Sequence, residues 1–209
     1  MNTNRFLILA AGLLLCAPVF TQQTAGTIRV NQENSTVYNR EVKFDNDIIH
    51  LNAAPDNGLL WINNSDFKNG TIELDVKGKN AQGQSFVGIA FHGTDNSHYD
   101  AVYFRPFNFK NPARNTHSVQ YVSMPDNDWS LLRTKFPGKY ENKVNPVPDP
   151  DDWFHMKLTV NYPEVKVYVN DASEPSLVIT QLSTRESGKI GFWVGNGSEG
   201  WFRNLKVAE

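Results

Sequence analysis

The chain has 209 residues, of which 40% are hydrophobic and 20% charged, and its formal net charge is −2. This length suits one globular domain with a sizeable core, since single all-β domains routinely reach it. The balanced charge gives neither the basic surface typical of nucleic-acid-binding proteins nor an acidic tail that would suggest a basic partner. We therefore expect no nucleic-acid partner.

The first 21 residues have the features of a secretory signal peptide. A single positive charge at Arg5 precedes an apolar run from Phe6 to Cys16, and this run is too short to span a bilayer comfortably. We expect residues 1–21 to be removed, the product to be secreted or periplasmic, and no segment to span a membrane. A lipid anchor at Cys16 is the alternative, although Leu15 is larger than the residue that such sites require. Cys16 is the only cysteine, so no intramolecular disulfide can form.

The rest of the chain reads as one short strand after another. Apolar and polar residues alternate in about a dozen segments, and turn-forming clusters such as PDNG, KNG and NDASEP separate them. No segment repeats its apolar residues at a helical period over three turns. The predicted strands lie within residues 41–51, 58–63, 70–78, 85–93, 99–109, 117–124, 153–161, 164–171, 176–182, 188–195 and 201–207.

Residues 125–152 form one long irregular region, rich in Pro, Asp and Asn. Because this region also contains Trp129, Leu132, Phe136 and Tyr140, we expect it to pack onto the body of the domain. We find no internal repeat and no linker. Residues 22–209 are therefore predicted to form a single all-β domain, a jelly-roll β-sandwich of two stacked antiparallel sheets.

Motifs near the C-terminus resemble a known fold. The hairpin sequence VKVYVND and the ending GKIGFWVGNGSEGWFRNLKV are similar to concanavalin A-like lectin/glucanase domains. Within that superfamily they resemble laminin-G-like modules and the bacterial 3-keto-disaccharide hydrolase family, formerly of unknown function. The likeness is strongest from Gly70 to Val207. It implies the sandwich fold but no single function, because one fold carries lectins, hydrolases and adhesion modules.

The segment GTIELDVKGK, Gly70–Lys79, resembles part of the catalytic motif of family 16 glycoside hydrolases. A retaining glycosidase needs two carboxylates about 5 Å apart, and Glu73 and Asp75 take the places of the nucleophile and its helper. The second glutamate of that motif is missing, since VKG follows. The alternation of Ile72, Leu74 and Val76 with polar residues indicates an ordinary half-buried strand.

The segment GNGSEG, Gly195–Gly200, matches the G-x-G-x-x-G pattern of dinucleotide sites. Such a site needs the loop to open a helix whose N-terminus holds the pyrophosphate. Here the loop precedes WFRNLKVAE, so we interpret it as a turn between strands that implies no nucleotide.

Strand alternation indicates which residues could line a groove on the concave sheet, where jelly-roll domains usually bind ligands. In residues 87–93 it places Gly88, Ala90 and His92 opposite the core-facing residues, and small residues would leave room for a ligand. Aromatic rings bury the apolar face of a sugar, and amide and guanidinium groups bond its hydroxyls. The predicted ligand-binding residues are His92, Tyr103, Arg105, Gln120, Trp193 and Trp129, with Tyr140 beside Trp129 at one end. The alternative is that Tyr103 and Trp193 belong to the core and that Arg105 is a structural ion-pair partner.

Catalytic residues stay unassigned at this level. Glu141, Asp100 and Glu199 could each act as a general acid or base, but nothing in the sequence pairs two carboxylates at a set distance. The five histidines show no close metal-ligand spacing. Asp95, Asn96 and Asp100 have side-chain oxygens that could bind a calcium ion, and calcium is common in related lectin-like domains. The sequence contains no EF-hand loop. We predict no other cofactor.

Three functions follow from these observations. The first is a secreted carbohydrate-binding or carbohydrate-processing module that holds an oligosaccharide or polysaccharide in its groove. The second, implied by the resemblance alone, is a glycoside hydrolase of the 3-keto-disaccharide hydrolase type. The third is a laminin-G-like module that binds a protein partner.

Overall fold

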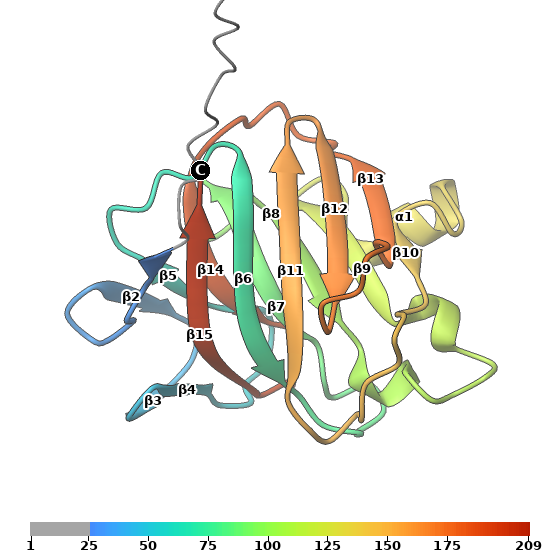
Figure 1. Ribbon diagram of the computed structural model, residues 1–209, viewed down its shortest axis with the longest axis horizontal. Coiled ribbons are helices and arrows are strands. Elements are labelled where there is room, and N and C mark those ends of the chain that lie inside the picture. The colour runs from blue at the N-terminus through green and yellow to red at the C-terminus, as the bar shows by residue number, and fades with distance from the viewer. Residues whose placement is uncertain (1–25) are drawn as a thin grey trace, which may run out of the picture.

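The computed structural model describes residues 26–209, which form two stacked antiparallel β-sheets (Figure 1). This arrangement confirms the predicted all-β class and jelly-roll sandwich. The predicted signal peptide and Cys16 lie outside the described residues. No helix within residues 26–209 is long and apolar enough to cross a bilayer.

The front sheet in Figure 1 has eight strands, and one of them, β1, pairs only with β15 at the side of the main path. In order across the sheet, the strands are β13 (Leu177–Thr180), β12 (Glu164–Val169), β11 (Phe154–Asn161), β6 (Gly70–Lys77), β15 (Gly200–Ala208), β4 (Ile48–Leu51) and β3 (Val42–Asp45), with β1 at Gly26–Thr27.

The rear sheet has seven strands. In order they are β10 (Glu141–Asn142), β9 (Val119–Met124), β8 (Tyr99–Phe104), β7 (Val87–Gly93), β14 (Lys189–Val194), β5 (Gly58–Ile62) and β2 (Ser35–Tyr38). Two 3-10 turns, η1 (Pro106–Asn108) and η2 (Asn115–His117), and one helix, α1 (Trp129–Lys135), complete the described elements.

Strand β6 shows how the sequence pattern forms the eight-stranded sheet. Ile72, Leu74 and Val76 are buried between the sheets, while the residues between them face outward and are half-buried, as the alternation predicted. The two sheets meet directly where Phe192 of β14 stacks on Phe202 of β15, with ring centroids 4.7 Å apart. This side of each sheet is the main hydrophobic core.

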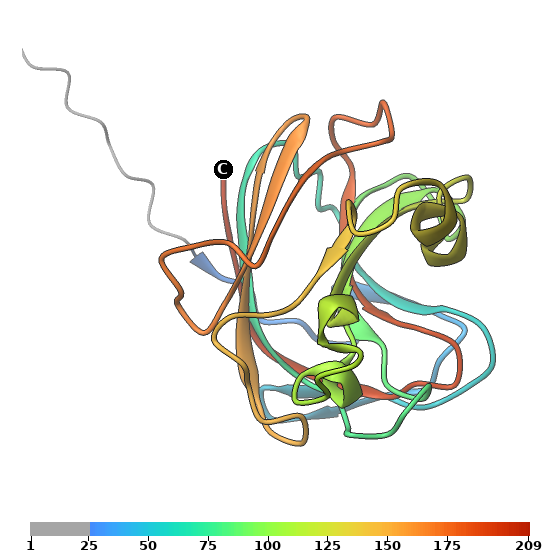
Figure 2. The same ribbon diagram turned by 90° about the vertical axis from the view of Figure 1, so that its right-hand side faces the viewer.

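The seven-stranded sheet differs, because β7 and β8 are buried on both faces. Part of the long region 125–152 lies on its outer side, and Figure 2 shows α1 beyond this sheet, away from the eight-stranded one. Leu132 and Tyr140 are buried, which confirms that the region packs onto the body. The helix itself was not predicted, since it is only seven residues long. Its N-cap is Asp128, whose side chain accepts a 2.7 Å hydrogen bond from the Leu131 amide.

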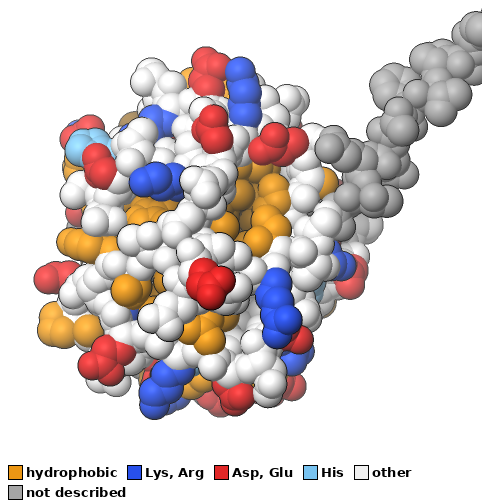
Figure 3. Space-filling model, turned by 90° about the vertical axis from the view of Figure 1, so that its left-hand side faces the viewer, with side chains coloured by type: hydrophobic (Ala, Val, Ile, Leu, Met, Phe, Trp, Pro, Cys, Tyr) orange, Lys and Arg blue, Asp and Glu red, His pale blue; other side chains and the backbone are white. Residues whose placement is uncertain are grey.

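Charges of both signs are scattered over the side of the molecule near β2 and β3. There, hydrophobic side chains gather in a hollow in the middle of the face, and Lys, Arg, Asp and Glu side chains surround them (Figure 3). No single sign of charge dominates this face, in keeping with the small net charge.

Candidate functional site

One cross-strand row on the outer face of the seven-stranded sheet contains most of the predicted site. Trp193 pairs with Gly88, Gly88 with Tyr103, Tyr103 with Gln120, and Gln120 with Glu141. Residues paired in this way point to the same face of a sheet. The structure therefore brings Tyr103, Gln120 and Trp193 together as strand alternation predicted, and it adds Glu141 at the end of the row.

The aromatic members of this row form a second buried layer. The rings of Tyr103 and Trp193 lie 4.8 Å apart, and the Trp193 Nε1–H donates a 3.1 Å hydrogen bond to the Tyr99 hydroxyl. All three side chains are buried. Burial raises the pKa of Tyr103 to about 12, although Arg105 acts in the opposite direction, so its hydroxyl stays protonated at neutral pH.

The small residues on this face do not leave room for a ligand, and that part of the prediction was wrong. A Cβ atom at Gly88 would lie 2.1 Å from the Val102 carbonyl oxygen and 2.6 Å from the Tyr103 Cα, and one at Gly191 would lie 2.7 Å from the Trp61 ring. The glycines instead allow close approach of the neighbouring strand and of the aromatic layer.

Two adjoining cavities lie above this layer, and we call them together the groove. One, of about 570 Å³, lies over Arg105, His117 and Arg133. The other, of about 220 Å³, lies over Tyr103 and Trp193. Phe86, Trp129 and Asn196 line both. The larger cavity is within the size range of small-molecule sites.

Helix α1 forms one wall of the groove. Trp129 and Arg133 are four residues apart and therefore share a face of the helix, and the Arg133 guanidinium lies 5.1 Å from the centre of the Trp129 ring. Trp129 is 48% exposed, so a ligand can contact it directly. This position agrees with the prediction that Trp129 bounds one end of the site. Tyr140, predicted beside it, is instead buried and packs against Tyr121.

A buried cluster of opposite charges lies at the Glu141 end of the groove. Arg133 donates two hydrogen bonds to the Glu141 carboxylate, of 2.8 and 2.5 Å. The Nδ1 atom of His117 lies 2.9 Å from Glu141 Oε2, and Arg105 Nη1 lies 3.7 Å from the same oxygen. Arg105 also donates to the Tyr103 hydroxyl and to Gln120 Oε1, at 2.7 and 3.2 Å.

Glu141 is held as a carboxylate by this cluster. Burial by itself raises the pKa of the Glu141 carboxyl, but the hydrogen bonds and charge of Arg133, followed by those of His117, outweigh it and leave the pKa below its ordinary value. Burial lowers the pKa of Arg105, yet a guanidinium stays charged at any ordinary pH. Glu141 is therefore an anchor for the guanidinium groups of Arg105 and Arg133 and not a proton donor.

His92 does not reach the groove, which corrects its predicted place. The pairing of β7 with β14 shifts register near Gly191, and His92 has a positive φ of 47°, so a bulge turns its side chain away from the face predicted by alternation. The ring is buried, with Nε2 2.8 Å from the Lys68 carbonyl oxygen and Nδ1 3.0 Å from Gln181 Nε2. Burial lowers the pKa of His92.

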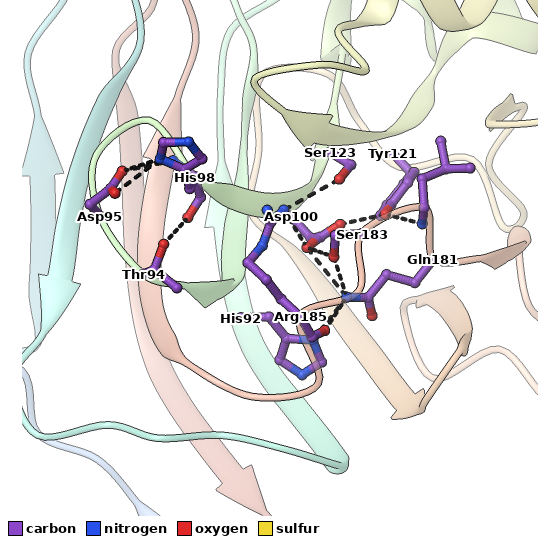
Figure 4. Close-up of polar contacts among 11 residues, drawn as sticks. His92, Thr94, Asp95, His98, Asp100, Tyr121, Ser123, Gln181, Ser183 and Arg185 are labelled. Atoms are coloured by element: carbon purple, nitrogen blue, oxygen red, sulfur yellow. Dashed lines mark hydrogen bonds and ion pairs between the residues drawn. The ribbon is translucent and has the colours of Figure 1, made fainter.

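Asp100 belongs to a buried network away from the groove, which Gln181 joins to His92 (Figure 4). Its carboxylate accepts hydrogen bonds from Tyr121, Ser183 and Arg185 at 2.5, 2.6 and 2.8 Å. These contacts hold the segment after β13 against β8 and β9, so Asp100 is structural and does not face the groove.

The oxygens predicted for calcium have other partners. The Asp95 carboxylate lies 2.9 Å from His98 Nδ1 and accepts from the Ser97 amide, and Figure 4 shows this pair apart from the Asp100 network. The Asn96 side chain accepts from the Trp61 indole. Among residues 26–209, no group of three His, Cys, Asp or Glu side chains is placed to hold a metal.

The remaining acidic candidates lie on the other sheet or in the turn that leads into it. Glu73 and Asp75 face outward from β6, which agrees with an ordinary half-buried strand. Glu199 pairs with His50 and Lys79. The segment Gly195–Gly200 is the turn between β14 and β15, as predicted.

Three residues that line the groove were not predicted, namely Phe86, His117 and Arg133. His117 lies in the 3-10 turn η2 and Arg133 on α1, and neither position follows from strand alternation. Only the i, i+4 spacing of Trp129 and Arg133 gave a local signal that the two could act together.

Comparisons with known proteins agree with this fold. The carbohydrate-binding module CBM66 from Bacillus subtilis is 14% identical, with a TM-score of 0.63 over 84% of this chain and 96% of that one. A putative glycosyl hydrolase from Parabacteroides distasonis is 12% identical, with a TM-score of 0.61 over 89% and 99%. The β-glucanase of Bacillus licheniformis is 15% identical, with a TM-score of 0.54 over 90% and 88%. At these identities the similarity shows the fold alone.

No curated protein matches the sequence significantly. The profile of one family, described as the 3-keto-alpha-glucoside-1,2-lyase-like domain, matches residues 21–208. This is nearly the whole chain, and it agrees with the resemblance found in the C-terminal motifs. The chain therefore belongs to the family of 3-keto-alpha-glucoside-1,2-lyase-like domains.

Proposed function

We propose that this chain binds an oligosaccharide in the groove over the seven-stranded sheet. The observation that carries the proposal is the exposed indole of Trp129 beside fixed polar groups on Asn196, His117 and Arg133, around one cavity of about 570 Å³. An aromatic ring covers the apolar face of a sugar, and convergent donors fix the hydroxyls. The N-terminal pattern of Arg5 and an apolar run supports secretion.

Two further facts support this proposal. Among the similar folds are a carbohydrate-binding module and glycoside hydrolases. The groove lining is also held rigid, because Arg105 is bonded to Tyr103 and Gln120, and Arg133 to Glu141. Rigid donors lose little freedom when a ligand binds. In this proposal Tyr103 and Trp193 are the floor, Gln120 supports Arg105 from beneath it, and Trp129, Arg133 and His117 make the contacts.

Replacing Trp129 with alanine should weaken oligosaccharide binding about tenfold, since the lost contact is one aromatic stack. The free energy of unfolding should change little, because the indole is 48% exposed. A thermal-shift screen with neutral and acidic oligosaccharides would identify the ligand, and calorimetry with each variant would give the affinity.

Phe136→Ala is the matched control. Phe136 is an aromatic residue of similar exposure, 39%, just after the same helix, and it does not line the groove cavities. Equal losses in the two variants would contradict the proposed groove. A panel with no binding at all would favour the third function, a module for a protein partner.

A second function, cleavage of a 3-keto-glucoside, is favoured by the pair of His117 and Glu141. The Nδ1 atom of His117 lies 2.9 Å from the Glu141 carboxylate, and a neutral imidazole with its proton on Nδ1 has Nε2 as its proton acceptor. A histidine oriented by a carboxylate in this way is a suitable general base. Family membership supplies the class of reaction, an elimination across C1 and C2 of the sugar.

The chemistry of this step needs a base and an oxyanion partner. The 3-keto group acidifies the proton on C2, and His117 Nε2 takes it as the electron pair passes into the carbonyl as an enolate. The enolate then forms the C1–C2 double bond while the C1–O bond breaks, and the proton ends on the departing oxygen. The Arg133 guanidinium, which also lines the cavity, would stabilise the enolate oxygen.

A further inference from the structure

We propose a second saccharide-binding site on the outer face of the eight-stranded sheet, made by Trp153, Lys77 and Trp201. It would take a chain of linked neutral sugar rings. This site lies on the opposite sheet from the groove and does not depend on the groove having a ligand.

The three side chains form one row across the sheet. Trp201 of β15 pairs with Lys77 of β6. Phe154 of β11 pairs with Val76, so Trp153, the residue before it, lies opposite Lys77. Phe154 and Val76 are buried in the core, hence the row that includes Lys77 faces outward. The two tryptophans are separated by two interstrand spacings, about 9.6 Å.

A cavity of about 640 Å³ lies over this row. Its lining includes both tryptophans, Lys77, and the side chains of Asn80 and Asp151 on neighbouring loops. This volume is within the range of ligand sites. The distance between the tryptophans suits an oligosaccharide, whose successive rings can lie on both, better than a single sugar.

Both tryptophan rings are held in place by side chains that project from the same face of the sheet. The Arg203 guanidinium lies 4.2 Å from the centre of the Trp153 ring, and the His50 ring stacks on Trp201 at 4.6 Å and 13°. Asp75 fixes Arg203, since its Oδ2 accepts a 3.1 Å hydrogen bond from Arg203 Nε. Rings that are already ordered lose little conformational entropy on binding.

This arrangement indicates a structural role, and not a catalytic one, for Asp75 in the segment GTIELDVKGK. Asp75 also contacts His155 Nδ1 at 3.0 Å and accepts from Asn204 at 2.8 Å. Burial raises the pKa of Asp75, but the hydrogen bonds from His155, Asn204 and Arg203 outweigh it and keep the pKa below its ordinary value. Asp75 is thus a positioning residue for the Trp153 platform.

The polar groups over the row suit hydroxyls more than a charged ligand. Lys77 is a donor between the rings. Asp151 is an acceptor, held by the Asn80 amide through a 2.8 Å hydrogen bond to Oδ1. Lys79 is neutralised by its ion pair with Glu199. Hydrogen-bond donors and acceptors near two aromatic rings are the features that recognise a neutral saccharide.

The test is affinity electrophoresis of residues 22–209, the predicted domain, in gels containing xyloglucan, mixed-linkage β-glucan or dextran. It is run in a Trp129→Ala background, so that the groove contributes least. We expect at least one polysaccharide to retard this protein, and Trp153→Ala or Trp201→Ala to lower its apparent affinity about tenfold. Tyr168→Ala is the matched control, because Tyr168 is a half-buried aromatic on the same outer face, below the Lys157 ammonium at 4.8 Å.

A second measurement uses the unsubstituted chain, so it does not require that any variant folds. In the unsubstituted chain, titration with the retained saccharide should shift the indole N–H signals of Trp153 and Trp201 and leave that of Trp61 unchanged, since Trp61 is buried in the other sheet. Unshifted indole signals at both positions, or equal retardation of the Trp153, Trp201 and Tyr168 variants, would overturn the second site. Retardation of the unsubstituted chain can also be compared with that of Trp129→Ala. Equal retardation of these two proteins, with losses in the Trp153 and Trp201 variants, would count against the groove and leave the second site standing.

Discussion

Glu141→Gln should lower the free energy of unfolding by about 3 kcal/mol at neutral pH. The substitution keeps the shape of the side chain but removes the negative charge that Arg105 and Arg133 share. Removing one partner of a buried pair costs about 3–5 kcal/mol, because the opposite charge is left uncompensated. We expect the lower end of this range, since the side chain of Arg133 is 34% exposed and water screens part of its charge.

The pH dependence of this loss gives a sharper test. The folded-state pKa of Glu141 lies below its ordinary value, so the ionised carboxylate stabilises the fold at pH above the unfolded pKa of about 4.3. That stabilisation is lost as the pH falls through the lowered folded-state pKa. The difference between wild type and Glu141→Gln in urea unfolding should therefore be largest near pH 7 and shrink below about pH 4.

Glu164→Gln is the control for this prediction. Glu164 pairs with Lys166 at 2.8 Å, but both side chains are well exposed, so its loss should leave the urea midpoint close to wild type at every pH. A Glu141→Gln midpoint that also stays at the wild-type value would mean that the arginines are not held by the carboxylate.

The strands could be predicted from the sequence because each contains its own pattern. Ile72, Leu74 and Val76 alternate with polar residues over the whole of β6, and the same local rule placed Tyr103 and Trp193 on one face. The rule was wrong at His92, where a shift in the pairing of β7 with β14 turns the side chain inward. The sequence around His92 does not predict that bulge, because the bulge depends on the pairing with the partner strand.

The groove could be predicted only in part, because its chemistry depends on contacts between distant segments. Glu141 lies in a strand of two residues, His117 in a 3-10 turn and Arg133 on a short helix. Each of these elements is too short to show a hydrophobic period. Glycines misled the prediction for a similar reason, since Gly88 makes room for the neighbouring strand of Tyr103 and not for a ligand.

His117→Gln should lower turnover of a 3-keto-α-glucoside by about 10²–10⁴-fold, which is the usual contribution of a positioned general base. The amide can bond to Glu141 but cannot take a proton from carbon. The probe is methyl 3-keto-α-glucoside, and product formation is followed by NMR. In D₂O, wild-type enzyme should also place deuterium at C2 of recovered substrate if proton removal is reversible, and His117→Gln should not.

His98→Gln is the matched control, because it separates the position of a histidine from its pairing. The Nδ1 atom of His98 lies 2.9 Å from Asp95 Oδ1, the same distance that joins His117 to Glu141, but His98 lies outside the groove cavities. If pairing with a carboxylate alone sufficed, both variants would lose activity. We expect only His117→Gln to do so, since its Nε2 can reach a sugar bound against Trp129 and Arg133. Turnover in His117→Gln within tenfold of wild type would assign the proton transfer to another group and leave the groove as a binding site only.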